Sequence, residues 1–155
     1  MKPLRKPEQS IGWKNGLAEV RQIYAALAAR PIERACIRVN ECCHFKPTGC
    51  TPYLTKGEAL LAAKALRASG RKEIPESVDG ACPLLDARSG NCLIYNDRPF
   101  GCRTHFCAAA GGPYERSEVL DLIRRLERVD AQLFGTGPKR IETAVIEALD
   151  ELAGR

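Results

Sequence analysis

Several patterns that would assign a function directly are missing from this sequence. It has no run of about 18 apolar residues, so we expect no membrane-spanning helix. It contains no phosphate-binding GxxxxGK[ST] pattern, no GxGxxG after a strand and no GxSxG nucleophile elbow. Residues 1–30 begin basic, but Glu19, Arg21 and Gln22 interrupt their best apolar stretch. We therefore also expect no secretory signal.

Cysteine, in contrast, is abundant, with eight in 155 residues. Without an export signal the expected location is cytoplasmic, where thiols stay reduced. Clustered cysteines in such a protein indicate metal binding or catalysis. Disulfides in an exported form, or eight unrelated thiols, are the alternatives.

The charge balance gives little support to nucleic-acid binding. The chain has 24 basic and 19 acidic residues, a net charge of +5. Two four-thiolate sites holding divalent ions would lower that charge to about +1, because bound thiols are deprotonated. The expected partner is a metal ion, with a protein partner as an option. Nucleic acid and a membrane are not expected.

Hydrophobic periodicity predicts a mainly α-helical fold in a single domain, 1–155, with an N-terminal arm over 1–16. Residues 17–30 have apolar side chains at helical spacing. Another helix begins at Thr55, where Glu58 three residues later completes a capping box, and it ends before Gly70.

Two further helices are predicted at the end of the chain, separated by the short stretch Gly135–Gly137. Ser117 is the expected N-cap of the first, and Pro138 suits the first turn of the second. Such a short connection predicts that residues 113–155 form an antiparallel C-terminal helical hairpin.

Long irregular, cysteine-rich loops separate these helices, at residues 32–54 and 71–112. A stretch of about 40 residues without regular structure is unusual in a compact domain. It becomes reasonable where bound metal replaces part of a hydrophobic core. Residues 32–112 are therefore predicted to form a small metal-stabilised, metal-binding core.

All eight cysteines and both histidines lie between residues 36 and 107. Thiolates select zinc, copper(I) or iron–sulfur clusters over magnesium or calcium. Eight thiols suffice for two Cys₄ zinc sites, two [4Fe–4S] clusters or one of each. Zinc is the expected cofactor, and iron or a [4Fe–4S] cluster is the alternative. The predicted ligands are Cys36, Cys42, Cys43, Cys50, Cys82, Cys92, Cys102 and Cys107.

The spacing adds detail to this prediction. Cys42 and Cys43 are adjacent, so in an extended segment their side chains point to opposite faces and suit two ions. Cys102 and Cys107 enclose a short loop and form a natural chelate. His44 and His105 are expected to support the site rather than bind metal. If they do bind, a cysteine is left for reaction or redox sensing.

Charged residues near the cysteines have structural interpretations. Asp86 and Asp97 suit turns, and Glu58 suits a helix cap, so none is predicted as an acid–base catalyst. Arg98 and Arg103 flank Cys102, where cations stabilise a thiolate. We expect them to neutralise the site and hold the loops, and we predict no catalytic residue.

The first cysteine cluster resembles the signature CxxCxxCC of the YkgJ-like cysteine-cluster family. Cys36, Cys42 and Cys43 fall on three of its four cysteines, and Val39 occupies the fourth position. Cys50 is a candidate for the missing thiol.

The second cluster is similar to the same family over a longer stretch. It runs through Cys82-Pro83-Leu84-Leu85-Asp86, Cys92-Leu93-Ile94-Tyr95, Arg98-Pro99 and Cys102-Arg103, and it ends at Cys107. The family usually has a proline before this last cysteine, whereas this sequence has Phe106. The resemblance covers about residues 35–108 and implies a zinc- or iron-chelating domain.

The sequence thus favours a metal-binding protein that chelates zinc, or iron, through clustered cysteines. A binding module is favoured over an enzyme. The alternative function is an iron–sulfur redox protein or an accessory of a protein-modifying enzyme. The family resemblance implies this alternative, because some proteins with a similar cysteine-cluster domain are iron–sulfur proteins or protein-modifying enzymes.

Overall fold

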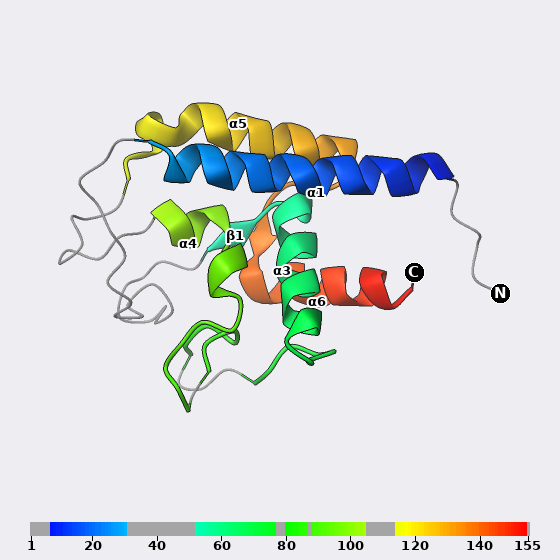
Figure 1. The fold of residues 1–155 in the computed structure, drawn as a ribbon, viewed down its shortest axis with the longest axis vertical. Helices are drawn as coiled ribbons and strands as arrows, with labels where there is room; N and C mark the ends of the chain where they lie inside the picture. The colour runs from blue at the N-terminus through cyan, green and yellow to red at the C-terminus, as the bar shows by residue number, and fades with distance from the viewer. Residues whose placement is uncertain (1–6, 31–51, 77–79, 87, 105–113, 155) are drawn as a thin grey trace.

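The structure is a computed structural model that describes residues 7–30, 52–76, 80–86, 88–104 and 114–154. Figure 1 shows a mainly α-helical fold, as predicted. The described elements are α1 (Pro7–Ala28), β1 (Tyr53–Leu54), α3 (Lys56–Ala68), η2 (Tyr95–Asp97), α4 (Phe100–Thr104), α5 (Arg116–Gln132), β2 (Lys139–Arg140) and α6 (Ile141–Ala153).

Helix α1 begins earlier than the sequence predicted. Residues 7–16, which we expected in an N-terminal arm, belong to this helix. Proline is tolerated in a first helical turn, and the cost of the two glycines is offset by packing. A Cβ added to the buried Gly16 would lie 3.1 Å from Leu133 Cδ1, so here glycine permits a close approach of α1 to the end of α5.

Helix α3 has the boundaries that its sequence predicted. The side chain of Glu58 accepts the backbone N–H of Thr55 at 2.9 Å, which is the reciprocal bond of the capping box. Ser69 is the C-cap, and Gly70 follows with a φ of +93°, a conformation that glycine adopts without strain.

Two helices follow one another at the C-terminal end, and each has its main contacts with another helix. Helix α5 runs antiparallel beside α1, and α6 packs on α3 (Figure 1). The N-cap of α5 is Glu115 rather than Ser117. Lys139 and Arg140 form β2, so α6 starts only at Ile141, three residues beyond Pro138.

A two-stranded antiparallel pairing joins the middle of the chain to its C-terminal part. Tyr53 in β1 pairs with Arg140 in β2, and Leu54 pairs with Lys139. Since α3 follows β1 directly and α6 follows β2 directly, this pairing brings the two helices together.

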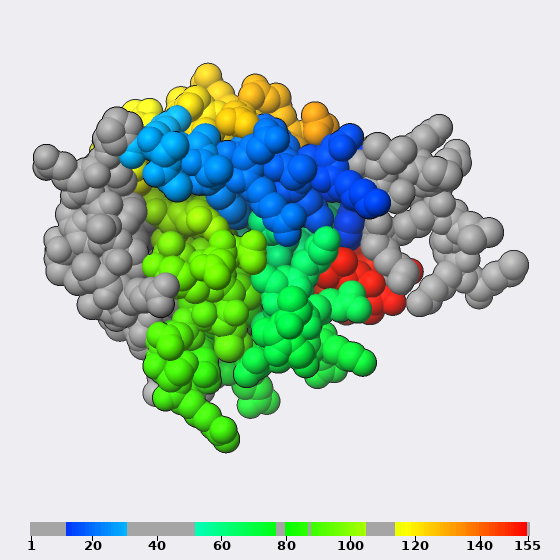
Figure 2. Space-filling model, viewed as in Figure 1, coloured from blue at the N-terminus to red at the C-terminus, as the bar shows by residue number. Residues whose placement is uncertain are grey.

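Buried side chains from α1, α3, α5 and α6 form one hydrophobic cluster. Four buried residues of the second cysteine segment, Cys82, Leu84, Ile94 and Phe100, belong to the same cluster. In the space-filling view, α1 lies across the upper part of the face, below α5 and above this segment and α3 (Figure 2). The segment is therefore anchored in the core, although it contains little regular structure.

Candidate metal centre

The first part of the second cysteine segment is a tight hairpin. The N–H of Leu93 donates to the carbonyl of Leu84 at 2.8 Å, and Leu85 forms a β-bridge with Cys92. Asp86 stabilises the turn because its carboxylate accepts the Ser89 hydroxyl at 2.8 Å. That bond, together with other donors in the turn, lowers the pKa of Asp86. The predicted turn role of Asp86 is confirmed.

Three of the predicted ligands fall within the described residues. Cys82 is buried directly before the hairpin, Cys92 lies on its returning arm, and Cys102 lies in α4. In the described part of the chain, no three His, Cys, Asp or Glu side chains gather closely enough to hold a metal. The complete ligand set stays a prediction, because the other candidates lie outside the described residues: Cys36, Cys42, Cys43, Cys50, Cys107, His44 and His105.

The short helix α4 is fixed at its start by a buried carboxylate. Glu58 is 2% exposed, and its Oε1 accepts the N–H of Phe100 at 2.7 Å and the hydroxyl of Tyr24 at 3.3 Å. Burial raises the pKa of Glu58, and the hydrogen bonds oppose this rise only in part. The helix cap predicted at Glu58 is confirmed, and it also links α1, α3 and α4.

Arg103 holds the turn that precedes α4. Its Nε donates to the carbonyl of Arg98 at 2.6 Å, and its Nη2 donates to the carbonyl of Asn96 at 2.7 Å. Its guanidinium lies 4.1 Å from the ring centroid of Tyr24. Arg98 makes a bond within the same turn, from its Nε to the carbonyl of Tyr95 at 3.0 Å. The predicted role of both arginines in holding the loops is confirmed.

The charges around Cys102 suit a thiolate. Burial lowers the pKa of Arg103, and ionised Tyr24, Asp97 and a thiolate at Cys102 would oppose this shift, in that order of size. Burial is the largest cause of the raised pKa of Tyr24, and the neighbouring Glu58 adds to it. Cys102 thus lies close to a half-buried cation, an environment that stabilises an anionic sulfur. The residues present here fit a metal bound through thiolate.

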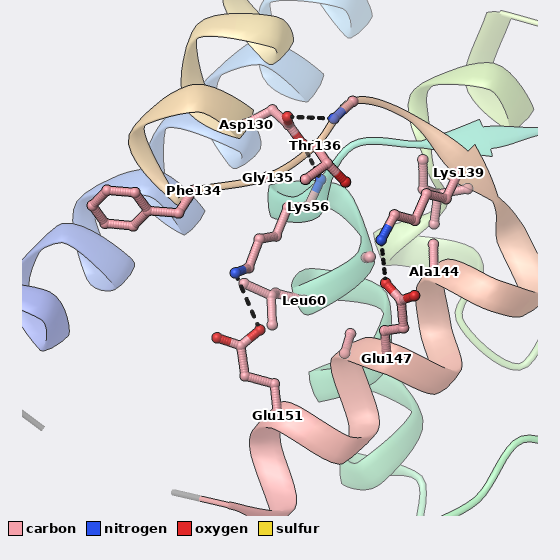
Figure 3. A pocket seen from close by; sticks show the side chains of 14 residues that line it. Lys56, Leu60, Asp130, Phe134, Gly135, Thr136, Lys139, Ala144, Glu147 and Glu151 are labelled. Carbon is pink, nitrogen blue, oxygen red and sulfur yellow. Dashed lines mark hydrogen bonds and ion pairs between the residues drawn. The ribbon is translucent and has the colours of Figure 1, made fainter. Parts of the chain in front are cut away.

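A separate groove lies between the start of α3, the end of α5 and α6 (Figure 3). None of the fourteen residues lining it is a cysteine or histidine. Four of its charged side chains form two ion pairs: Lys56 Nζ lies 3.4 Å from Glu151 Oε2, and Lys139 Nζ lies 2.6 Å from Glu147 Oε2. The groove therefore offers no donor set for the metals that thiolates select.

Sequence reasoning missed two buried polar positions. Tyr24 lies in the predicted helix 17–30, and the apolar spacing of that stretch carries no signal for its contacts with Glu58 and Arg103. Asp130 lies near the end of α5 and is 6% exposed, although no sequence pattern distinguishes it from the exposed charges of that helix. Its Oδ1 accepts the N–H of Lys56 at 2.8 Å and its Oδ2 accepts that of Gly137 at 3.0 Å.

Comparison with known proteins identifies the family of the chain. No curated protein and no solved structure matches it. Among the helices that the structure describes, none has the length and hydropathy needed to cross a membrane. All eight cysteines and both histidines fall within residues 35–123, where the chain matches the family model CxxCxxCC, "Putative zinc- or iron-chelating domain". Because this match covers more than half of the sequence, the chain belongs to the CxxCxxCC family.

Proposed function

We propose that this protein binds zinc through the thiolates of its two cysteine clusters, within residues 32–112. His44 and His105 support the ligands rather than replace them. The proposed ligands are Cys36, Cys42, Cys43, Cys50, Cys82, Cys92, Cys102 and Cys107.

The observation that carries this proposal is the environment of Cys102. It lies in a short helix whose first residue is held by the buried Glu58, and the next residue in the chain is the half-buried cation Arg103. A metal ligand has to be held in a fixed place, and a thiolate ligand is favoured by a nearby cation. The chelating character of the family agrees with both features.

The proposed zinc has a structural role in a single domain. Zinc bound by four protein ligands has no open coordination position and contributes directly to folding. Such a site joins the cysteine segments 32–54 and 71–112 and leaves no position for a substrate. A cytoplasmic location is part of the proposal, because a reducing compartment keeps the thiols available.

Metal analysis of natively purified protein tests this function. We expect about one or two zinc ions per chain, in a colourless protein. An anomalous difference map at the zinc edge should place each ion among cysteine sulfurs. A folded, metal-free protein with eight titratable thiols would contradict the proposal. A brown protein that contains iron and acid-labile sulfide would replace zinc by an iron–sulfur cluster.

A further inference from the structure

We propose that Arg103 is a positioning residue of the metal centre, and that its guanidinium fixes Cys102 by joining the turn before α4 to the ring of Tyr24 in α1. This inference rests on the proposed function, because it takes Cys102 to be a metal ligand. It assigns to Arg103 a geometric role that a positive charge alone does not provide.

Three contacts of Arg103 carry the first step. The guanidinium donates from Nε and from Nη2 to two carbonyls of the preceding turn, those of Arg98 and Asn96. At the same time it lies over the aromatic ring of Tyr24. A planar fork can make these contacts together, whereas a lysine ammonium is a single point of charge on a flexible stem.

The second step is that α4 is held near both of its ends by the same pair of buried residues. Phe100, its first residue, donates its N–H to Glu58 at 2.7 Å. Arg103, near its other end, contacts Tyr24, and Tyr24 donates its hydroxyl to Glu58. A helix of five residues does not hold its shape alone, so these ties determine where it lies.

Cys102 lies between these two ties. Its N–H donates to the carbonyl of Pro99 at 3.0 Å, and the N–H of Arg103 donates to the same carbonyl at 3.1 Å. Pro99 is fully buried. A shift of Arg103 would therefore move the backbone of Cys102 relative to the core. Residues that orient metal ligands commonly change metal affinity by about 10–100-fold when they are replaced.

Arg98 shows why charge alone does not account for the arrangement. It stands four residues before Cys102 and carries the same charge, but its Nε bond is to Tyr95 and its guanidinium lies 4.1 Å from the Tyr95 ring centroid. Both contacts are within its own turn. Arg103, in contrast, reaches across to another helix.

The test uses the full chain loaded with cobalt(II), because thiolate-bound cobalt has visible absorption bands that report ligand geometry. The Arg103→Lys variant keeps the charge and loses the planar contacts. We expect it to bind cobalt about tenfold more weakly, with altered thiolate-to-cobalt bands. Arg125→Lys is the matched control, because Arg125 donates two bonds to Glu19 between α1 and α5, and this variant should keep the wild-type affinity and spectrum. Wild-type affinity and spectrum in Arg103→Lys would overturn the inference.

Tyr24 provides a second pair of variants, in case Arg103→Lys does not fold. Tyr24→Phe loses the hydroxyl bond to Glu58 but keeps the ring under Arg103, so its cobalt spectrum should stay close to that of the wild type. Tyr24→Leu removes the ring and should change it. Identical spectra from the two folded variants would also overturn the inference.

A readout without metal separates this inference from the proposed function. If the wild-type chain takes up no cobalt or zinc, the proposed function fails. Hydrogen exchange of the Cys102 and Arg103 amides still tests the positioning of α4 by Arg103. We expect these amides to exchange at least about tenfold faster in Arg103→Lys than in the wild type, without a matching change in Arg125→Lys. Equal rates in all three proteins would overturn the role of Arg103.

Discussion

The carboxylate of Glu58 in α3 accepts the backbone N–H of Phe100 in α4 at 2.7 Å, across 42 positions of the sequence. The same carboxylate caps α3 through Thr55 and accepts the hydroxyl of Tyr24 from α1. One side chain thus completes a local helix cap and holds the segment that carries Cys102. This double role makes Glu58 the most informative residue for mutation.

The change Glu58→Gln should destabilise the fold even though it preserves size. Each carboxyl oxygen accepts a backbone N–H, one from Phe100 and one from Thr55, and each keeps a lone pair for this bond when the group is protonated. A glutamine amide has only one oxygen, so its NH₂ group must face one of these donors. We expect a loss of about 1–3 kcal/mol in the free energy of unfolding, measured by urea denaturation at acidic pH. The matched control is Glu118→Gln at the equivalent capping position of the exposed start of α5, where the loss should be much smaller.

The cost of Glu58→Gln should also depend on pH in a defined direction. Burial raises the pKa of Glu58 above its ordinary value of 4.5, so the folded chain holds this proton more tightly than the unfolded chain does. The resulting stabilisation is fully present below the unfolded-state pKa, and it is lost as pH rises through the folded-state pKa. The difference between wild type and variant should therefore shrink from acidic to neutral pH. Unfolding curves recorded with a chelator present exclude metal release; a difference that grows with pH would contradict the raised pKa.

Local signals explain how much of the fold could be predicted. The limits of α3 followed from Thr55, Glu58 and Gly70, because capping chemistry depends on neighbours in the sequence. The start of α1 was missed because Gly12 and Gly16 resemble helix breakers until the packing of Gly16 against Leu133 is known. Tertiary packing of this kind overrides intrinsic propensity.

The candidate site was predictable in composition but not in geometry. The cysteine spacing and the family resemblance identified the ligands that are proposed above. They carried no information on the contacts of Tyr24 and Arg103, because these residues come from segments far apart in the chain. A motif records which residues a site needs, whereas the residues that hold it in place are selected by the three-dimensional fold.

The two glycines Gly135 and Gly12 should respond to alanine in opposite directions. A Cβ at Gly135 would lie 2.3 Å from Asp130 Oδ1, so Asp130 would have to leave its hydrogen bonds. We expect Gly135→Ala to lower the free energy of unfolding by about 2–4 kcal/mol. Nothing lies within 4 Å of a Cβ added to Gly12 in α1, and Gly12→Ala should stabilise the fold by about 1 kcal/mol. Thermal unfolding of both variants checks the signs, and a neutral Gly135→Ala would contradict the close approach.

Replacing Asp130 by asparagine should weaken the connection between the start of α3 and the loop after α5, and so destabilise the fold. Its two carboxylate oxygens accept the N–H groups of Lys56 and Gly137. In asparagine one of these oxygens becomes an NH₂ group, which would face a backbone N–H and could not accept it. The expected loss is about 2 kcal/mol in urea unfolding. Asp121→Asn serves as the control, since Asp121 forms an exposed ion pair with Arg30. Its unfolding midpoint should move much less; equal shifts would mean that the buried bonds of Asp130 add nothing.

Phe134 should be replaceable by glycine with a gain in stability. It lies just beyond the end of α5 with a φ of +60°, a left-handed conformation that is unfavourable for residues with a Cβ, and its side chain is 82% exposed. Phe134→Gly relieves this backbone cost, while Phe134→Ala keeps it and removes the same ring. We expect the glycine variant to be about 1 kcal/mol more stable than the alanine variant in thermal or urea unfolding. If the alanine variant proves as stable as the glycine variant, the left-handed backbone of Phe134 is not retained in solution.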